Sequence, residues 1–148
     1  MIAVDSNILV YAHRRDVPEH AAAARCLTEL AEGQERWAIP WPCVYEFFSK
    51  TTHPRIFHPP STRAQALLQL EAWFASPSLG LIGETDPFWP GLSKLVEAGR
   101  IAGPMVHDAR IAAICLHHGV RELWTADRDF DRFPNLRVRN PLVDDIRN

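Results

Sequence analysis

Five short apolar segments, separated by stretches with the periodicity of helices, constrain the fold of this chain more than any other feature. The segments lie at residues 2–4, 37–39, 79–82, 122–125 and 136–138. Each is of strand length, and turn or cap residues stand between it and the next helical stretch. Strands that alternate with helices form a mainly parallel sheet, because each crossover returns the chain in the same direction. The sequence therefore predicts an α/β fold.

The stretches between these segments carry residues that begin and end helices. Ser6 or Asn7 is placed to cap a short helix, and Pro18 stands at the first turn of a helix that Gly33 ends. The prolines at residues 54, 59 and 60 exclude a helix around them. Helices are expected at residues 8–11, from 18 to 32, from 42 past 48, from 61 to 74, at 87–98 and at 106–118.

The composition is that of a globular protein, and we expect residues 1–148 to form a single domain. Of the 148 residues, 47% are hydrophobic and 23% charged, which excludes a largely disordered or fibrous chain. The net charge of −2 gives no global basic excess, although a local basic cleft is compatible with it. Three cysteines without a CxxC pair favour a reducing, cytoplasmic compartment over a disulfide framework. We expect neither a membrane span nor a signal peptide, because no apolar run approaches 18 residues and no basic leader precedes Asp5.

Two acidic residues follow predicted strands. Asp5 comes directly after the first strand, and Asp127 comes just after the fourth. In open α/β sheets, ligand sites lie outside the carboxyl ends of the strands, so both positions are candidates for a site. An aspartate at a strand end is also a common cap or turn residue. For each residue alone, the sequence leaves both interpretations open.

Two further acids lie on predicted helices. Asp108 heads an apolar stripe that includes Ile111 and Cys115, so its carboxylate is directed toward the packing side of the helix. The alternative is an acid that interacts with the helix dipole from the first turn. Glu46 is the lone acid in a helix of Val, Tyr and Phe, but Lys50 lies four residues later, so a surface ion pair is its alternative.

The four acidic residues could form a cation-binding site if the fold brings their carboxylates together. Two carboxylates about 5 Å apart repel by roughly 3 kcal/mol at an effective dielectric constant near 20, so a group of four needs protons or a cation. Oxygen ligands of this kind suit Mg²⁺ or Mn²⁺. Such an ion activates water and stabilises charge during attack on a phosphodiester. The sequence alone leaves the convergence open.

Four motifs, in order and spacing, resemble those of the PIN-domain ribonucleases, and the short length resembles the VapC-type toxins of bacterial toxin–antitoxin pairs. The motifs are Asp5-Ser6-Asn7, Glu46 on an early helix, Asp108-Ala-Arg-Ile-Ala-Ala and Thr125-Ala-Asp127-Arg-Asp129-Phe130. The last two are the most specific. The resemblance covers essentially the whole chain and implies a PIN-like domain, with a parallel sheet of about five strands flanked by helices on both faces.

The resemblance also implies a divalent-metal site. Asp5 and Asp108 would be the principal ligands of Mg²⁺, or of Mn²⁺, and Glu46 and Asp127 would complete the acidic group. The side chains that would orient or assist these four carboxylates are Asn7, Thr125 and Asp129. The implied reaction is hydrolysis of RNA by metal-activated water, which leaves a 5′-phosphate and a 3′-hydroxyl. The implied partners are an RNA substrate, an inhibitory antitoxin protein and a second copy of the chain in a homodimer.

Two other functions compete with this one. A haloacid-dehalogenase-like phosphatase also has an aspartate after its first strand, but it needs a second aspartate two residues later, where Asn7 stands. A non-catalytic PIN-like RNA-binding or scaffold module is the other alternative. A module that only binds a polyanion gains nothing from clustered carboxylates, so the four acids argue against it. Basic residues near the acidic motifs are candidates for contacts with RNA phosphates: Arg14, Arg15, Lys50, Arg110, Arg128 and Arg132.

Overall fold

The computed structural model describes residues 1–144 and contains a five-stranded parallel sheet. The strands are β1 (Ile2–Val4), β2 (Trp37–Pro40), β3 (Leu79–Ile82), β4 (Glu122–Trp124) and β5 (Val138–Arg139), arranged in the order β3-β2-β1-β4-β5. All four neighbouring pairs are parallel, which confirms the predicted sheet. The last strand begins two residues later than predicted, because the backbone N–H of Leu136 donates to the carbonyl oxygen of Phe133 in a turn.

Seven α-helices and two short 3₁₀ helices connect and follow these strands within the described residues. The α-helices are α1 (Ser6–His13), α2 (His20–Glu32), α3 (Trp41–Thr51), α4 (Arg63–Phe74), α5 (Trp89–Ala98), α6 (Val106–His117) and α7 (Pro141–Asp144). The 3₁₀ helices are η1 (Gly103–Met105) and η2 (Arg128–Arg132). The prediction that Pro18 lies in the first helical turn is wrong, because α2 begins at His20 and Pro18 belongs to the preceding turn. Residues 53–60 are not helical, as their prolines predict.

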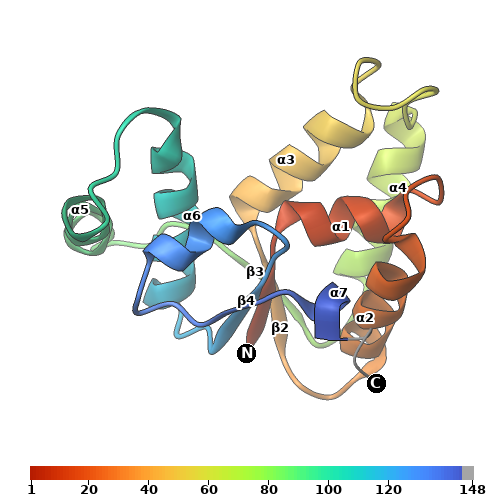
Figure 1. The fold of residues 1–148 in the computed structure, drawn as a ribbon. Coiled ribbons are helices and arrows are strands. Elements are labelled where there is room, and N and C mark those ends of the chain that lie inside the picture. Colours follow the sequence, from red (N-terminus) through yellow and green to blue (C-terminus); the bar gives the residue numbers. More distant parts are fainter. Residues whose placement is uncertain (145–148) are drawn as a thin grey trace.

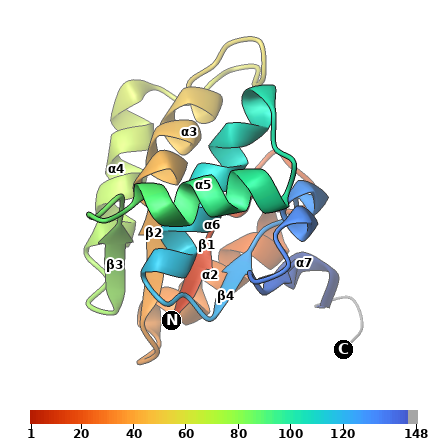
Figure 2. The ribbon, with the colours of Figure 1, turned by 90° about the vertical axis from the view of Figure 1, so that its left-hand side faces the viewer.

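The helices form a layer on each face of the sheet (Figure 1), as expected. Helices α5 and α6 lie on one face, and α1, α2 and α4 lie on the other. Viewed from the α5 side, α5 crosses in front of α6 and the strands (Figure 2). Right-handed crossovers explain this division, because the chain steps in one direction from β1 to β3 and then returns past β1 to β4. The strand order therefore reverses between β1 and β4, where α/β folds place their ligand sites.

The central strands are buried between these layers. Ala3 and Val4 of β1, Ala38 of β2 and Leu123 of β4 have no exposed surface. Three alanines on α6 are also buried, and their small side chains bring this helix close to the sheet. Among the described residues, none of the helices has the length and apolar character that a bilayer crossing needs.

The segment between α3 and α4 is attached to the end of α1 through Arg14. The guanidinium group donates to the carbonyl oxygen of Pro59 (3.0 Å) and to the hydroxyl of Ser61 (3.3 Å). It also lies 4.3 Å from the centre of the Phe57 ring. Asp16 balances its charge with an ion pair at 2.6 Å. These contacts hold a proline-rich segment in place although it has no regular structure of its own.

Candidate metal centre

Asp5 stands where the central strand ends and α1 begins. Its backbone N–H donates to the carbonyl oxygen of Trp124 (3.0 Å), which ties this point to β4. Its carboxylate is 4% exposed and caps α1 by accepting the backbone N–H of Ser6 at 2.7 Å. The prediction that Ser6 or Asn7 caps this helix is wrong, because both side chains are turned to other partners. Asp5 is a helix cap, and its second carboxylate oxygen is still directed to the end of β4.

Thr125 connects that second oxygen to the rest of the β4 end. Its hydroxyl accepts the side-chain N–H of Asn7 and the backbone N–H of Asp127, both at 3.0 Å. Its proton is therefore donated to Oδ2 of Asp5, at 2.7 Å. The Asn7 amide is fixed as well, because its oxygen accepts the backbone N–H of Ala126 (3.2 Å). Thr125 thus holds the Asp5 carboxylate directly, and Asn7 contacts that carboxylate at 3.4 Å while it donates to Thr125.

Three aspartates converge beside this network. One carboxylate oxygen from each of Asp108, Asp127 and Asp129 lies within 4.8 Å of the other two. Asp108 comes from the first turn of α6, and Asp127 caps η2 by accepting the backbone N–H of Asp129 at 2.9 Å. We call these three residues the acidic cluster. The structure brings Asp129 fully into this group, whereas the sequence suggests for it only an assisting place.

Electrostatic coupling joins the acidic cluster to Asp5 and Glu46. The pKa of Asp108 is raised to about 6, first by burial and then by the surrounding negative charges. Those charges belong to Asp127, Asp5, Asp129 and Glu46. Burial also raises the pKa of Asp5, against the lowering effect of the hydrogen bonds from Thr125 and Ser6. The Asp108 carboxylate is therefore exposed to the charges of four other acidic side chains at this edge of the sheet.

Glu46 reaches the site from α3. Its carboxylate accepts the hydroxyl proton of Ser6 at 2.7 Å. Among the described residues no ion pair joins Glu46 to Lys50, so the surface-pair interpretation of this glutamate is not realised. Glu46 and Asp5 lie outside the 4.8 Å group of the acidic cluster and border it. Ser6 links them, because its backbone contacts Asp5 and its hydroxyl contacts Glu46.

Cys43 is a site neighbour that the sequence analysis missed. Its side chain is fully buried, and the thiol donates to Oδ1 of Asp5 at 3.4 Å. Burial and the Asp5 charge raise the pKa of this thiol well above its ordinary value, so it keeps the proton that it donates. Cys43 and Glu46 are three residues apart on α3, and this spacing puts them on neighbouring parts of the helix surface. The spacing places Cys43 near Glu46 in the sequence, but it does not predict the contact with Asp5.

This arrangement fits a hard divalent cation. The acidic cluster offers carboxylate oxygens alone, which are the ligands that such ions prefer. A cation placed among them would offset the repulsion that raises the Asp108 pKa. The cysteine sulfur is hydrogen-bonded to Asp5 and is not a member of the cluster.

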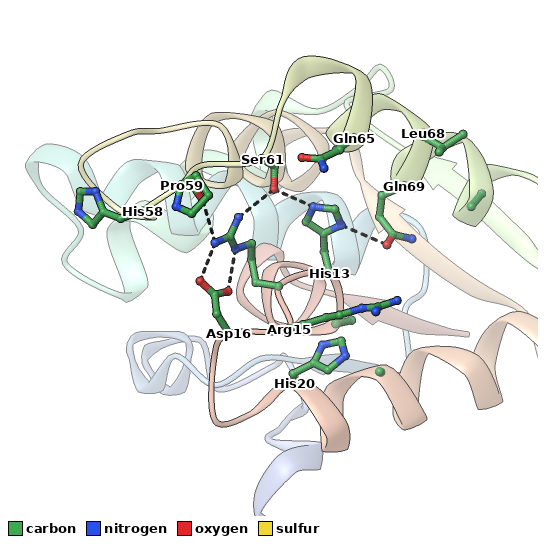
Figure 3. A pocket seen from close by; sticks show the side chains of 14 residues that line it. His13, Arg15, Asp16, His20, His58, Pro59, Ser61, Gln65, Leu68 and Gln69 are labelled. Atoms are coloured by element: carbon green, nitrogen blue, oxygen red, sulfur yellow. Dashed lines mark hydrogen bonds and ion pairs between the residues drawn. The ribbon is translucent and has the colours of Figure 1, made fainter.

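The basic candidates divide into two groups. Arg14 is paired with Asp16, and Arg110 is paired with Glu84 at 3.0 Å, so both are engaged within the protein. The candidates that the structure leaves on the surface are Arg15, Lys50, Arg128 and Arg132. A separate pocket lies at the far end of α1, where His13 contacts Ser61 and Gln69 (Figure 3). None of the four acids predicted for the metal site lines that pocket.

Comparison with known proteins assigns this arrangement to a family. Residues 2–136 match the PIN domain family. Over 142 residues the chain is 34% identical to Ribonuclease VapC43 of Mycobacterium tuberculosis, with 96% of each chain covered. It is 29% identical over 138 residues to Ribonuclease VapC48 of the same organism, with 93% of this chain and 95% of the relative covered.

Solved structures have the same fold. VapBC2 from Rickettsia felis, bound to a DNA fragment from its promoter, superposes with a TM-score of 0.67 at 22% identity, covering 94% of this chain and 98% of the other. FitAcB from Neisseria gonorrhoeae gives a TM-score of 0.64 at 18% identity, covering 95% and 98%. At these identities the likeness is one of fold. The match over residues 2–136 places this chain in the PIN domain family.

Proposed function

We propose that this chain is the ribonuclease toxin of a toxin–antitoxin pair and that it hydrolyses RNA with a bound divalent metal ion. The observation that carries the proposal is the acidic cluster beside the buried Asp5, at the sheet edge where the strand order reverses. Relatives that are 29–34% identical over nearly the whole chain are named ribonucleases, which supports an RNA substrate. Mg²⁺ is the expected ion, and Mn²⁺ is its closest substitute.

In the proposed mechanism, Asp5 and Asp108 hold the ion, and Glu46 and Asp127 complete its surroundings. When bound, the ion activates water and stabilises the charge that develops on the phosphate. Thr125 fixes the Asp5 carboxylate, Asn7 fixes the Thr125 hydroxyl, and Ser6 fixes Glu46. Asp129 adds a third carboxylate to the acidic cluster. The products would be a 5′-phosphate and a 3′-hydroxyl.

The proposed partners follow from the same assignment. The solved VapBC2 structure supports an antitoxin protein as a partner of this chain. A homodimer is the oligomeric state proposed for it, and the cytoplasm is the proposed compartment, in agreement with three buried cysteines that form no disulfide among the described residues. The phosphatase alternative is disfavoured, because the side chain at its second acidic position, Asn7, is an amide held by Thr125 and Ala126.

An RNA-cleavage assay tests this function. The purified protein would be incubated with total RNA from its native host in Mg²⁺, in Mn²⁺ or in EDTA, and the new ends mapped by sequencing. We expect cleavage at a few sites that requires metal and is lost in Asp5→Asn. Cleavage that persists in EDTA, or in the Asp5→Asn variant, would refute the metal-dependent mechanism. A folded protein that binds Mn²⁺ but cuts none of these RNAs would favour the scaffold alternative.

A further inference from the structure

The Asp5 carboxylate has two close and two distant hydrogen-bond donors. Each oxygen accepts one bond of 2.7 Å, Oδ1 from the backbone of Ser6 and Oδ2 from the hydroxyl of Thr125. Each also accepts one bond of 3.4 Å, Oδ1 from Cys43 and Oδ2 from Asn7. A carboxylate has about four acceptor positions, so protein donors occupy all of them. A metal ion that takes one of these positions would replace a donor. The two weakest donors are the Asn7 amide, whose N···O distance exceeds the usual range, and the Cys43 thiol, which is a weak donor by its chemistry.

The two weak donors differ in what else they contact. The Asn7 amide also donates to Thr125 at 3.0 Å, so it keeps a partner if it leaves Asp5. The Cys43 thiol is fully buried, and its described hydrogen bond is the one to Asp5. Releasing that bond would leave a buried donor without an acceptor, so Oδ2, and not Oδ1, is the oxygen that can be freed at the smaller cost.

We propose that Cys43 is a positioning residue for Asp5: its thiol holds Oδ1 against α3, so that Oδ2 remains available to a metal ion. The inference rests on the proposed metal-dependent function and deepens it. Cys43 suits this task because it lies in the first turn of α3, which the Trp41-Pro42 pair begins directly after β2. A thiol is a weak donor, so it restrains the carboxylate without withdrawing much of the negative charge that the ion needs.

Mn²⁺ titration by calorimetry, with thermal unfolding in EDTA as a separate readout, tests this role. Loss of a side chain that orients a metal ligand lowers metal affinity by about 10–100-fold, and for a weak donor we expect the lower end, about tenfold, in Cys43→Ala. Cys43→Ser restores a donor of similar size and should stay within about threefold of the wild-type Kd. The matched control is Cys26→Ala, which removes another buried thiol, on α2, and should lower the Tm without changing the Mn²⁺ Kd.

The outcomes are distinguishable. An unchanged Mn²⁺ Kd in Cys43→Ala would overturn the positioning role and leave the proposed function intact. Equal weakening in Cys43→Ala and Cys26→Ala would overturn it too, because general loosening of the core would then explain the effect. If Cys43→Ala does not fold, Cys43→Val, which fills the space without a donor, is compared with Cys43→Ser. A loss of Mn²⁺ affinity in the valine variant alone supports the role, and equal Kd values in the two variants refute it. A wild-type protein that binds no Mn²⁺ would overturn the proposed function together with this inference.

Discussion

Burial and the negative charges of neighbouring acids both make the ionised form of Asp108 less favourable. Because its folded-state pKa of about 6 lies above the ordinary value of 3.8, the metal-free folded protein binds this proton more tightly than the unfolded chain. Lowering the pH through 6 toward 4 therefore adds stability at this residue, and the ionised form above pH 6 costs stability. After allowance for solvent screening, this cost is about 1 kcal/mol.

Asp108→Asn is accordingly expected to stabilise the metal-free protein. At pH 7.5 in EDTA the Tm should rise by roughly 2–4 °C, as follows from about 1 kcal/mol in a chain of this size. Calorimetry at pH 7.5 and pH 5.5 measures the effect, which should shrink at the lower pH. Glu71→Gln, a change at an exposed acid on α4, is the control. A lower Tm in Asp108→Asn would contradict this account of the charge repulsion.

The hydroxyl of Thr125 donates a hydrogen bond to Asp5, and valine at this position has no group that could do so. Thr125→Val keeps the shape of the side chain but leaves Asp5, Asn7 and the backbone of Asp127 each without one partner. We expect a loss of about 2 kcal/mol in the free energy of unfolding, as for buried polar groups that lose their partners. Urea denaturation measures it. Thr125→Val should also weaken Mn²⁺ binding, because Asp5 loses the donor that holds it. Thr125→Ser keeps the hydroxyl and should retain Mn²⁺ binding. Equal loss of Mn²⁺ binding in the two variants would contradict the hydrogen-bond explanation.

At the scale of elements, the end of α1 holds the segment between α3 and α4. Arg14→Ala removes the contacts to Phe57, Pro59 and Ser61. We expect faster amide exchange in residues 53–61 and a stability loss of about 1–2 kcal/mol. Hydrogen exchange read by mass spectrometry checks this. Arg15→Ala changes the exposed neighbour and should leave the exchange of that segment unchanged; protection that survives in Arg14→Ala would show that other contacts hold it.

His13 makes the same junction sensitive to pH. Burial lowers its pKa below the ordinary value of 6.5, and the charge of Arg14 acts in the same direction. The folded state therefore binds this proton less tightly than the unfolded chain, so its contribution to stability is complete above pH 6.5 and decreases as the pH falls below that value. Between pH 7.5 and pH 5.5, the Tm of the wild type should fall relative to that of His13→Gln. Parallel curves for the two proteins would refute this assignment.

The sequence predicted the elements better than their ends. Hydrophobic periodicity located the strands and the long helices, because burial of an apolar face governs both. The sequence predicts Ser6 or Asn7 as the cap of α1 and leaves a capping role open for Asp5, and local rules cannot choose among three neighbouring residues that all favour cap positions. Within the site, the structure brings Asp108 and Asp127 together, a convergence that the sequence alone leaves open. Cys43 escaped notice, because its contact with Asp5 spans 38 residues and depends on tertiary packing.

For the whole molecule, one edge of the sheet carries concentrated negative charge, so a bound cation should stabilise the entire fold. At a Mn²⁺ concentration of about 100 times the Kd, binding to the folded state alone adds about 2.7 kcal/mol. The Tm should then rise by roughly 5–10 °C. Differential scanning fluorimetry with Mn²⁺, at constant ionic strength, measures this shift. An equal rise in Asp5→Asn would mean that the stabilising ion binds elsewhere.

The hydrogen bonds that complete the site join distant parts of the chain. The Thr125–Asp5 bond spans 120 residues, and the Asn7–Thr125 bond spans 118. Because β4 pairs directly with the central strand β1, Asp5 acquires these partners only when β4 has joined the sheet. During synthesis on a ribosome, residues near 125 emerge long after Asp5. A nascent chain that still lacks β4 would therefore present an unfinished acidic centre, and the Asp5 carboxylate would gain its partners only after residues near 125 have left the ribosome.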